Sequence, residues 1–344
     1  MSEDVQRSSS RVRFPGISPR AYEHPVDRGA LATLRTVPGF PAVLKAVAGA
    51  WSERGERLMA LASAIRVGPS QCPVLHRIRT ECAETLDLDT VPAVFVANNP
   101  ALGAVTIGMD EPFVVVNTGL VEALDEEGLR FAIGHEMGHV LSGHAVYRTM
   151  LLRLINIQNS MGWLPVGYWG IRAIIAALLE WFRKAELSCD RAGLLCGQDP
   201  SAALRVHLML AGGLDPAQVD VPSFLQQARE YSSVEDIRDS LLKLKYVTDM
   251  SHPLAVVRAA QLQQWAASEE YRAILAGDYP RRADDEPAST WSDDLKSAAR
   301  SYKDSWSAST DPLAKVLGEV GGAISGVADK VFTKFTSKED RGGQ

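Results

Sequence analysis

Apolar residues recur at helical spacing over much of the chain. Residues 25–37, 41–65 and 73–86 each repeat apolar side chains every three or four positions. Such residues lie on one face of a helix, so each stretch predicts an amphipathic helix with a buried side. We expect the first two helices to pack against a larger body.

The pattern changes between residues 91 and 117. Three short runs rich in β-branched and aromatic residues are separated by turn-forming Asn, Pro, Gly and Asp residues. Such runs are typical of β-strands joined by tight turns. They predict a small antiparallel sheet with strands at residues 93–97, 102–107 and 112–116.

Helical spacing returns after this region, where residues 149–157 and 163–182 are strongly apolar. A bilayer-spanning helix needs about 20 largely uncharged residues, whereas Pro165, Arg172 and Glu180 interrupt the second stretch. We predict a buried or surface-docked helix at 163–182 and keep membrane insertion or interfacial membrane contact as the alternatives. Further helices are predicted at 201–212, 222–230, 234–247 and 253–275.

Composition shifts divide the chain into five parts. Residues 1–20 are polar and are expected to be disordered, and 21–66 hold the N-terminal helices. Residues 67–276 form the main body. Residues 277–312 are rich in Asp, Ser and Arg and predict a linker. Residues 313–344 predict an amphipathic helix and tail, whose apolar face (313–335) could dock on the body, on a partner or on a membrane surface.

The composition narrows the class of protein. Of the 344 residues, 46% are hydrophobic, which is enough for a sizeable core. A net charge of −6 does not indicate the basic surface that nucleic-acid binding needs. The first fifteen residues lack the apolar stretch of a secretory signal. The four cysteines are not spaced in pairs as in zinc sites, and they are too few for a disulfide-rich protein. We expect a cytoplasmic protein, with membrane association as an option and the oligomeric state open.

The strongest chemical signal is His-Glu-Met-Gly-His at residues 135–139. On a helix, His135 and His139 lie one turn apart on the same face, where both imidazoles can bind one metal ion. Glu136 lies about 100° around the helix, which places its carboxylate beside the metal, where it can hold a water molecule. Asp125 is a suitable N-cap for this helix.

A catalytic zinc usually has three protein ligands and one position open to water. A third histidine six residues after the second is ruled out, because Gly143 and His144 fall at the wrong offsets. Glu186, on a later helix, fits as the third ligand. Asp190 lies one turn further along the same face and could accept the ring N–H of a ligating histidine.

These motifs, in this order and spacing, resemble peptidase family M48, the gluzincin zinc metallopeptidases that include the Ste24, HtpX and Oma1 proteases. The resemblance covers roughly residues 60 to 265. It includes the segment 114–124 before the metal helix and 251–258 after it, which is similar to the family's His-Pro-x-x-x-x-Arg. It implies a predominantly helical α+β fold, with a zincin-like catalytic domain, a small sheet and an HExxH active-site helix.

The resemblance also implies a zinc-dependent endopeptidase, with protein quality control as a suggested setting. One zinc ion held by His135, His139 and Glu186 would lower the pKa of a bound water toward neutrality and polarise the scissile carbonyl. Glu136 would accept the proton of the water and pass it to the leaving amine. The substrate would be a protein or peptide, whose backbone would pair with an edge strand of the sheet.

The other histidines are weighed individually. His252 lies in a Ser-His-Pro turn within the family motif, where it could stabilise the oxyanion, gate the open metal position or only cap the next helix. His24, His76 and His207 are expected to be structural, and Cys189 to be a small buried residue.

A competing function is a zinc-retaining adaptor or chaperone-like module that does not cleave and that associates peripherally with membranes. The presence of Glu136 favours the protease, because an adaptor does not need a general base.

Overall fold

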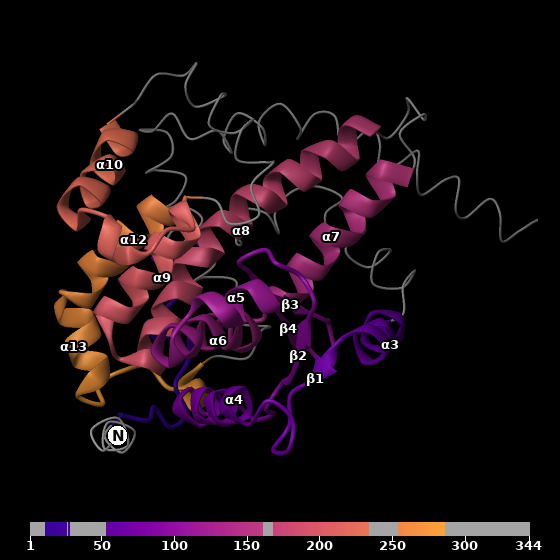
Figure 1. Ribbon diagram of the computed structural model, residues 1–344, viewed down its shortest axis with the longest axis horizontal. Helices are drawn as coiled ribbons and strands as arrows, with labels where there is room; N and C mark the ends of the chain where they lie inside the picture. Colours follow the sequence, from indigo (N-terminus) through magenta and orange to yellow (C-terminus); the bar gives the residue numbers. More distant parts are fainter. Residues whose placement is uncertain (1–10, 26, 28–52, 161–167, 234–253, 286–344) are drawn as a thin grey trace, which may run out of the picture.

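The computed structural model describes residues 11–25, 27, 53–160, 168–233 and 254–285. In Figure 1 a small sheet lies on one side of the central helix α6, and the helices α9, α12 and α13 lie on the other. The predicted fold class, predominantly helical α+β, is confirmed.

The sheet has four strands in the order β1-β2-β4-β3. Its strands are β1 (Ile65–Arg66), β2 (Ala93–Ala97), β3 (Ala104–Ile107) and β4 (Phe113–Asn117). β1 and β2 are antiparallel, as are β3 and β4, but β2 and β4 run parallel, with Ala93 opposite Phe113. The prediction of an antiparallel sheet is therefore wrong in this respect. The chain leaves β2 for the edge strand β3 and returns by a hairpin, so β4 lies between them and runs parallel to β2.

Ten α-helices belong to the described part of the chain. They are α3 (Glu53–Ser63), α4 (Pro73–Thr85), α5 (Thr118–Ala123), α6 (Glu126–Leu141), α7 (His144–Ser160), α8 (Tyr168–Gly197), α9 (Pro200–Gly212), α10 (Val221–Ser233), α12 (Ala255–Ala266) and α13 (Glu269–Leu275).

Two helix predictions change in the structure. The apolar stretch after residue 163 and the segment that carries Glu186 form one continuous helix, α8, of 30 residues. The predicted helix 253–275 is divided into α12 and α13, because Ser268 caps α13 by accepting a hydrogen bond from the backbone N–H of Tyr271.

The α8 helix packs against α6 and α7. Ile174, Ile175, Leu178 and Trp181 are all buried. Within the described residues, no helix is both long and apolar enough to cross a membrane. The predicted segments 234–247 and 313–344, which include one candidate membrane surface, lie outside the described residues.

The prediction of disorder is wrong for residues 11–20. Phe14 and Ile17 are fully buried in the main core, and Gly16 between them adopts a positive φ of 67° that turns the chain. Ile17 pairs with Arg281, and the backbone N–H of Ser18 donates to the carbonyl of Pro280. The start of the predicted linker, residues 277–285, is therefore also held against the N-terminal segment, by this backbone pairing and by Tyr279, whose ring contacts Phe14.

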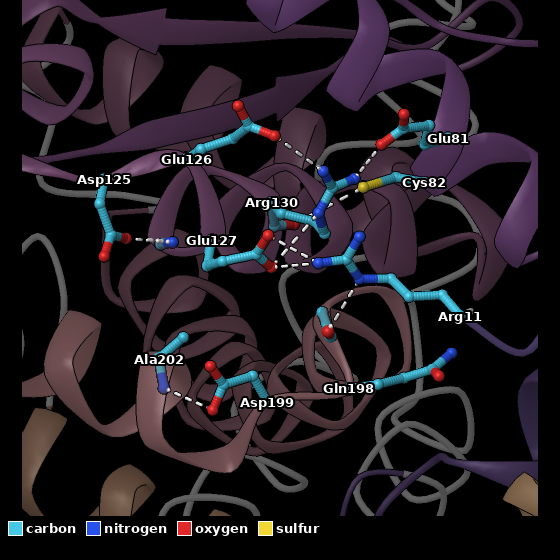
Figure 2. A network of polar contacts seen from close by, with 12 residues as sticks. Arg11, Glu81, Cys82, Asp125, Glu126, Glu127, Arg130, Gln198, Asp199 and Ala202 are labelled. Carbon is cyan, nitrogen blue, oxygen red and sulfur yellow. Dashed lines mark hydrogen bonds and ion pairs between the residues drawn. The ribbon is translucent and has the colours of Figure 1, made fainter. Parts of the chain in front are cut away.

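An arginine on α6 fixes the position of that helix. Arg130 is 1% exposed, and its guanidinium contacts the carboxylates of Glu81, Glu126 and Glu127 (Figure 2). Arg11 reaches the same cluster, since it pairs with Glu127 and donates to the carbonyl of Gly197. Four parts of the chain, the N-terminal segment, α4, α6 and the end of α8, meet at this cluster.

Replacing Arg130 by methionine should lower the free energy of unfolding by about 2 kcal/mol, because three carboxylates lose their shared buried cation. Urea denaturation of the purified protein would measure the change. The matched control is Arg77→Met, since Arg77 pairs with Glu81 and Glu126 but is 41% exposed. It should cost less than about 1 kcal/mol. Equal losses for both variants would contradict the role assigned to Arg130.

Candidate metal centre

Helices α6 and α8 supply the polar groups at the centre of the domain. α6 carries His135 and His139, and α8 carries Glu186 opposite them. The Nε2 atom of His139 lies 3.2 Å from Oε1 of Glu186, and Nε2 of His135 lies 3.6 Å from Oε2. All three side chains are buried. The structure thus brings together the three residues that the sequence selects as a set.

This donor set suits a divalent transition metal, because two imidazole nitrogens and a carboxylate are the ligands of many catalytic zinc sites. Burial lowers the pKa of His139 to about 4, so its ring is neutral at pH 7, as a metal ligand must be. Burial also favours a neutral His135, but Glu186 and Asp190 outweigh it and raise the pKa to about 9. A metal ion would have to displace a proton from His135.

The predicted contact between Asp190 and His135 is present. Oδ1 of Asp190 lies 3.0 Å from Nδ1 of His135, so it can accept the ring N–H and leave Nε2 free. Oδ2 of Asp190 lies 3.3 Å from Nε2 of His207, whose Nδ1 is 2.8 Å from the carbonyl oxygen of Ala203. His207 is therefore a buried histidine whose ring lies between two acceptors, in the structural role that was expected.

Arg258, on α12, contacts both buried carboxylates. Its Nη1 lies 2.8 Å from Oε2 of Glu186, and its Nη2 lies 2.6 Å from Oδ1 of Asp190. Burial would raise the pKa of both carboxyl groups, but Arg258 is the foremost charge that holds them well below their usual range. The sequence motif contained Arg258 without indicating this contact. His252 lies outside the described residues, so its role stays a prediction.

Glu136 is held from two sides. The hydroxyl of Thr106, on β3, donates to its Oε2 at 2.6 Å, and Nη1 of Arg148, on α7, lies 3.5 Å from the same oxygen. Burial would raise the pKa of Glu136, but Arg148 and the two histidines outweigh it and lower the pKa. No sequence pattern indicated Thr106 or Arg148, because only tertiary structure brings β3 and α7 to α6.

A second group of donor atoms lies beside the first. One ring nitrogen each of His139 and His144 and the sulfur of Cys189 all lie within 4.8 Å of one another. Cys189 is fully buried, as expected, and burial raises the pKa of its thiol well above the usual range. His144 does not face Glu186 with the other two histidines; its Nε2 lies 3.3 Å from Oδ2 of Asp27.

Comparison with known proteins identifies this arrangement. Residues 69–266 match the model of peptidase family M48. The chain belongs to peptidase family M48. A relative from Arabidopsis thaliana, the plastoglobule-localized metallopeptidase 48 of the chloroplast, is 33% identical over 279 residues, which are 79% of each chain. Protease HtpX of Xylella fastidiosa is 26% identical over 225 residues, 57% of this chain and 73% of that protein. No solved structure matches the chain.

As an M48 peptidase the chain is a metal-dependent protease, a hydrolase that acts on proteins or peptides. The matched residues contain both histidines of the motif, Glu186 and Arg258, so most of the centre lies within the family region. The N-terminal segment 11–27 lies outside it.

The centre depends on a close approach of α6 and α8. A Cβ atom at Gly138 would lie 2.6 Å from the Cβ of Ala192, and one at Gly134 would lie 2.5 Å from the Cβ of Cys196. Both distances are too short for carbon atoms that the helix backbones hold in place. The two glycines therefore set the spacing at which Glu186 faces the histidines.

Replacing Gly138 by alanine should force α8 away from α6. Alanine is the better helix former by roughly 0.5–1 kcal/mol, yet we expect a net loss of about 1–3 kcal/mol of unfolding free energy from overpacking. A bound metal ion should also dissociate faster, since Glu186 moves with α8. The control is Gly197→Ala at the end of α8, where no atom lies within 4 Å of the added carbon. An unfolding free energy and a rate of metal release that both stay unchanged in Gly138→Ala would contradict this role.

Proposed function

We propose that the chain is a zinc-dependent endopeptidase in which His135, His139 and Glu186 hold the metal and Glu136 is the general base. The observation that carries the proposal is the convergence of both Nε2 atoms on one carboxylate of α8, with Glu136 on the same helix as the histidines. Asp190 would fix the tautomer of His135. A structural zinc is disfavoured, because such sites use four ligands and are typically rich in cysteine.

When bound, zinc would supply a water molecule of lowered pKa and would polarise the scissile carbonyl. Glu136 would accept a proton from the attacking water and return it to the leaving amine. Arg148 and Thr106 support this role, because they favour an ionised carboxylate and fix its orientation. A base must be both unprotonated and within reach of the proton that it accepts.

The sheet provides a surface for the substrate. β3 is one of the two edge strands of the sheet, and its Thr106 contacts Glu136. An extended peptide that adds to this edge by main-chain hydrogen bonds would pass next to the general base. Such binding depends little on side chains, which favours unfolded segments as substrates and agrees with a role in protein quality control.

The cellular location stays a prediction. The sequence favours the cytoplasm, and the name of the Arabidopsis relative places that protein at plastoglobules. A peripheral position at a lipid surface would reconcile the two and is our proposal for this chain.

Glu136→Gln should lower the cleavage of unfolded casein by about 10²–10⁴-fold, because proton transfer to the base is lost. Its zinc content, measured by elemental analysis, should equal that of the wild type. Equal cleavage by this variant and the wild type would overturn the mechanism. Zinc retention without cleavage in the wild type itself would favour the adaptor function.

Glu186→Ala should lose zinc and activity together, because the third ligand is removed. The matched control is Glu122→Ala, at an exposed position on α5, which should keep both. Full zinc content in Glu186→Ala would exclude Glu186 as a ligand.

Thr106→Val should lower kcat by about tenfold with little change in KM, since a hydrogen bond to a charged group contributes about 1.5–3 kcal/mol. Thr106→Ser keeps the hydroxyl and should restore most of the rate. Zinc content should not change in either variant. A serine variant as slow as the valine variant would show that the methyl group, not the hydroxyl, is needed.

A further inference from the structure

The N-terminal segment places a buried carboxylate beside the metal centre. Asp27 is 1% exposed, although it lies more than forty residues before the family-matched region begins at residue 69. It accepts hydrogen bonds from Nε1 of Trp181 at 3.0 Å and from the hydroxyl of Ser188 at 2.6 Å. Its Oδ2 also lies 3.3 Å from Nε2 of His144. Burying a carboxylate is costly unless it is hydrogen-bonded or paired, and Asp27 has three such partners, which fix its position.

His144 connects this carboxylate to the histidine ligand His139. Its Nδ1 lies 3.5 Å from the sulfur of Cys189. The rings of His139 and His144 meet edge to face, with centroids 5.5 Å apart. A nitrogen of each ring and the sulfur of Cys189 lie within 4.8 Å of one another. The contacts therefore lead from Asp27 through His144 and Cys189 to His139.

The two histidines of the motif differ in their outer contacts. His135 has Asp190 at its Nδ1, whereas Nδ1 of His139 is buried and has no hydrogen-bond partner among the described residues. A ligating histidine almost always donates its second N–H to an acceptor, which fixes the tautomer. Because Nε2 of His139 faces Glu186, its proton belongs on Nδ1. The sulfur of Cys189, a weak acceptor, lies within 4.8 Å of a nitrogen of this ring.

We propose that Asp27 is a positioning residue for the metal ligand His139, acting through His144 and Cys189. Asp27 accepts the proton of Nε2 of His144 and holds that ring with its Nδ1 beside the sulfur of Cys189. A lone pair of the sulfur is then directed to the Nδ1–H of His139. The inference rests on the proposed function, because it requires His139 to bind the metal.

This arrangement assigns different roles to the two ends of the N-terminal segment. Arg11 anchors one end at Glu127 and Gly197, at the start of α6 and the end of α8 (Figure 2). Asp27 anchors the other end at the middle of α8 and at His144. Loss of either anchor can loosen the segment, but only loss of Asp27 should alter the metal centre.

The test is the rate at which the zinc-loaded full-length protein releases zinc to a colorimetric chelator. Asp27→Asn keeps the shape of the side chain but removes the acceptor for one of its partners, and Cys189→Ala removes the proposed acceptor for His139. Each should speed zinc release by about 10–100-fold, the usual effect of losing an outer partner of a ligand. The double variant should be no faster than the worse single variant, because both act in one chain of contacts.

The matched control is Arg11→Gln, which removes the far anchor of the same segment and should release zinc at the wild-type rate even if its melting temperature falls. Wild-type protein that holds no zinc would defeat the proposed function itself. A wild type that holds zinc tightly, together with Asp27→Asn and Cys189→Ala variants that release it at the same rate, would overturn only the role of Asp27. Two zinc ions per chain, one of them lost in Cys189→Ala, would overturn it as well, because the cluster would then be a metal site of its own.

Discussion

The contact of Arg258 with Glu186 and Asp190 is the interaction on which the centre depends. Two carboxylates on adjacent turns of α8 are buried, and each would pay a large desolvation penalty alone. The guanidinium, itself 3% exposed, lies within 3 Å of both. Two negative charges against one positive charge leave a single net negative charge facing the histidines, which favours a divalent cation there. Helix α12 is therefore part of the metal centre although it supplies no ligand.

The second constraint is the distance between α6 and α8. Ligands from two helices can share one ion only if the helices approach more closely than most side chains allow. Gly134 and Gly138 on α6 and Gly193 on α8 leave that space, since a Cβ at any of them would meet an atom of the other helix at 2.7 Å or less. The histidines and the glycines alternate along α6, so one short motif provides both the proposed ligands and the close packing.

The sequence predicted contacts between residues that are close along the chain, and it missed contacts between distant segments. Asp125 caps α6 as predicted, by accepting a hydrogen bond from the backbone N–H of Gly128 at 2.7 Å. Such a cap joins residues only three positions apart, so the local sequence is enough to predict it. The helical spacing of His135 and His139 is equally local, and Glu186 was selected because Asp190 lies one turn further along the same helix face. The parallel pairing of β2 with β4, the packing of residues 11–20 on 277–285 and the contacts of Thr106, Arg148 and Arg258 all join distant segments. No periodicity or turn signal encodes such contacts, so they required the structure.

The two histidines of the motif have outer partners of different strength. His135 faces a carboxylate that Arg258 and His207 hold in place, all within the family-matched region. His139 faces a thiol and a second imidazole, whose carboxylate partner comes from the N-terminal segment. A thiol sulfur is a weak acceptor compared with a carboxylate. If both histidines bind the ion, His139 is therefore held less firmly than His135. The segment that carries Asp27 then influences how long the metal stays bound more than the contacts of His135 do.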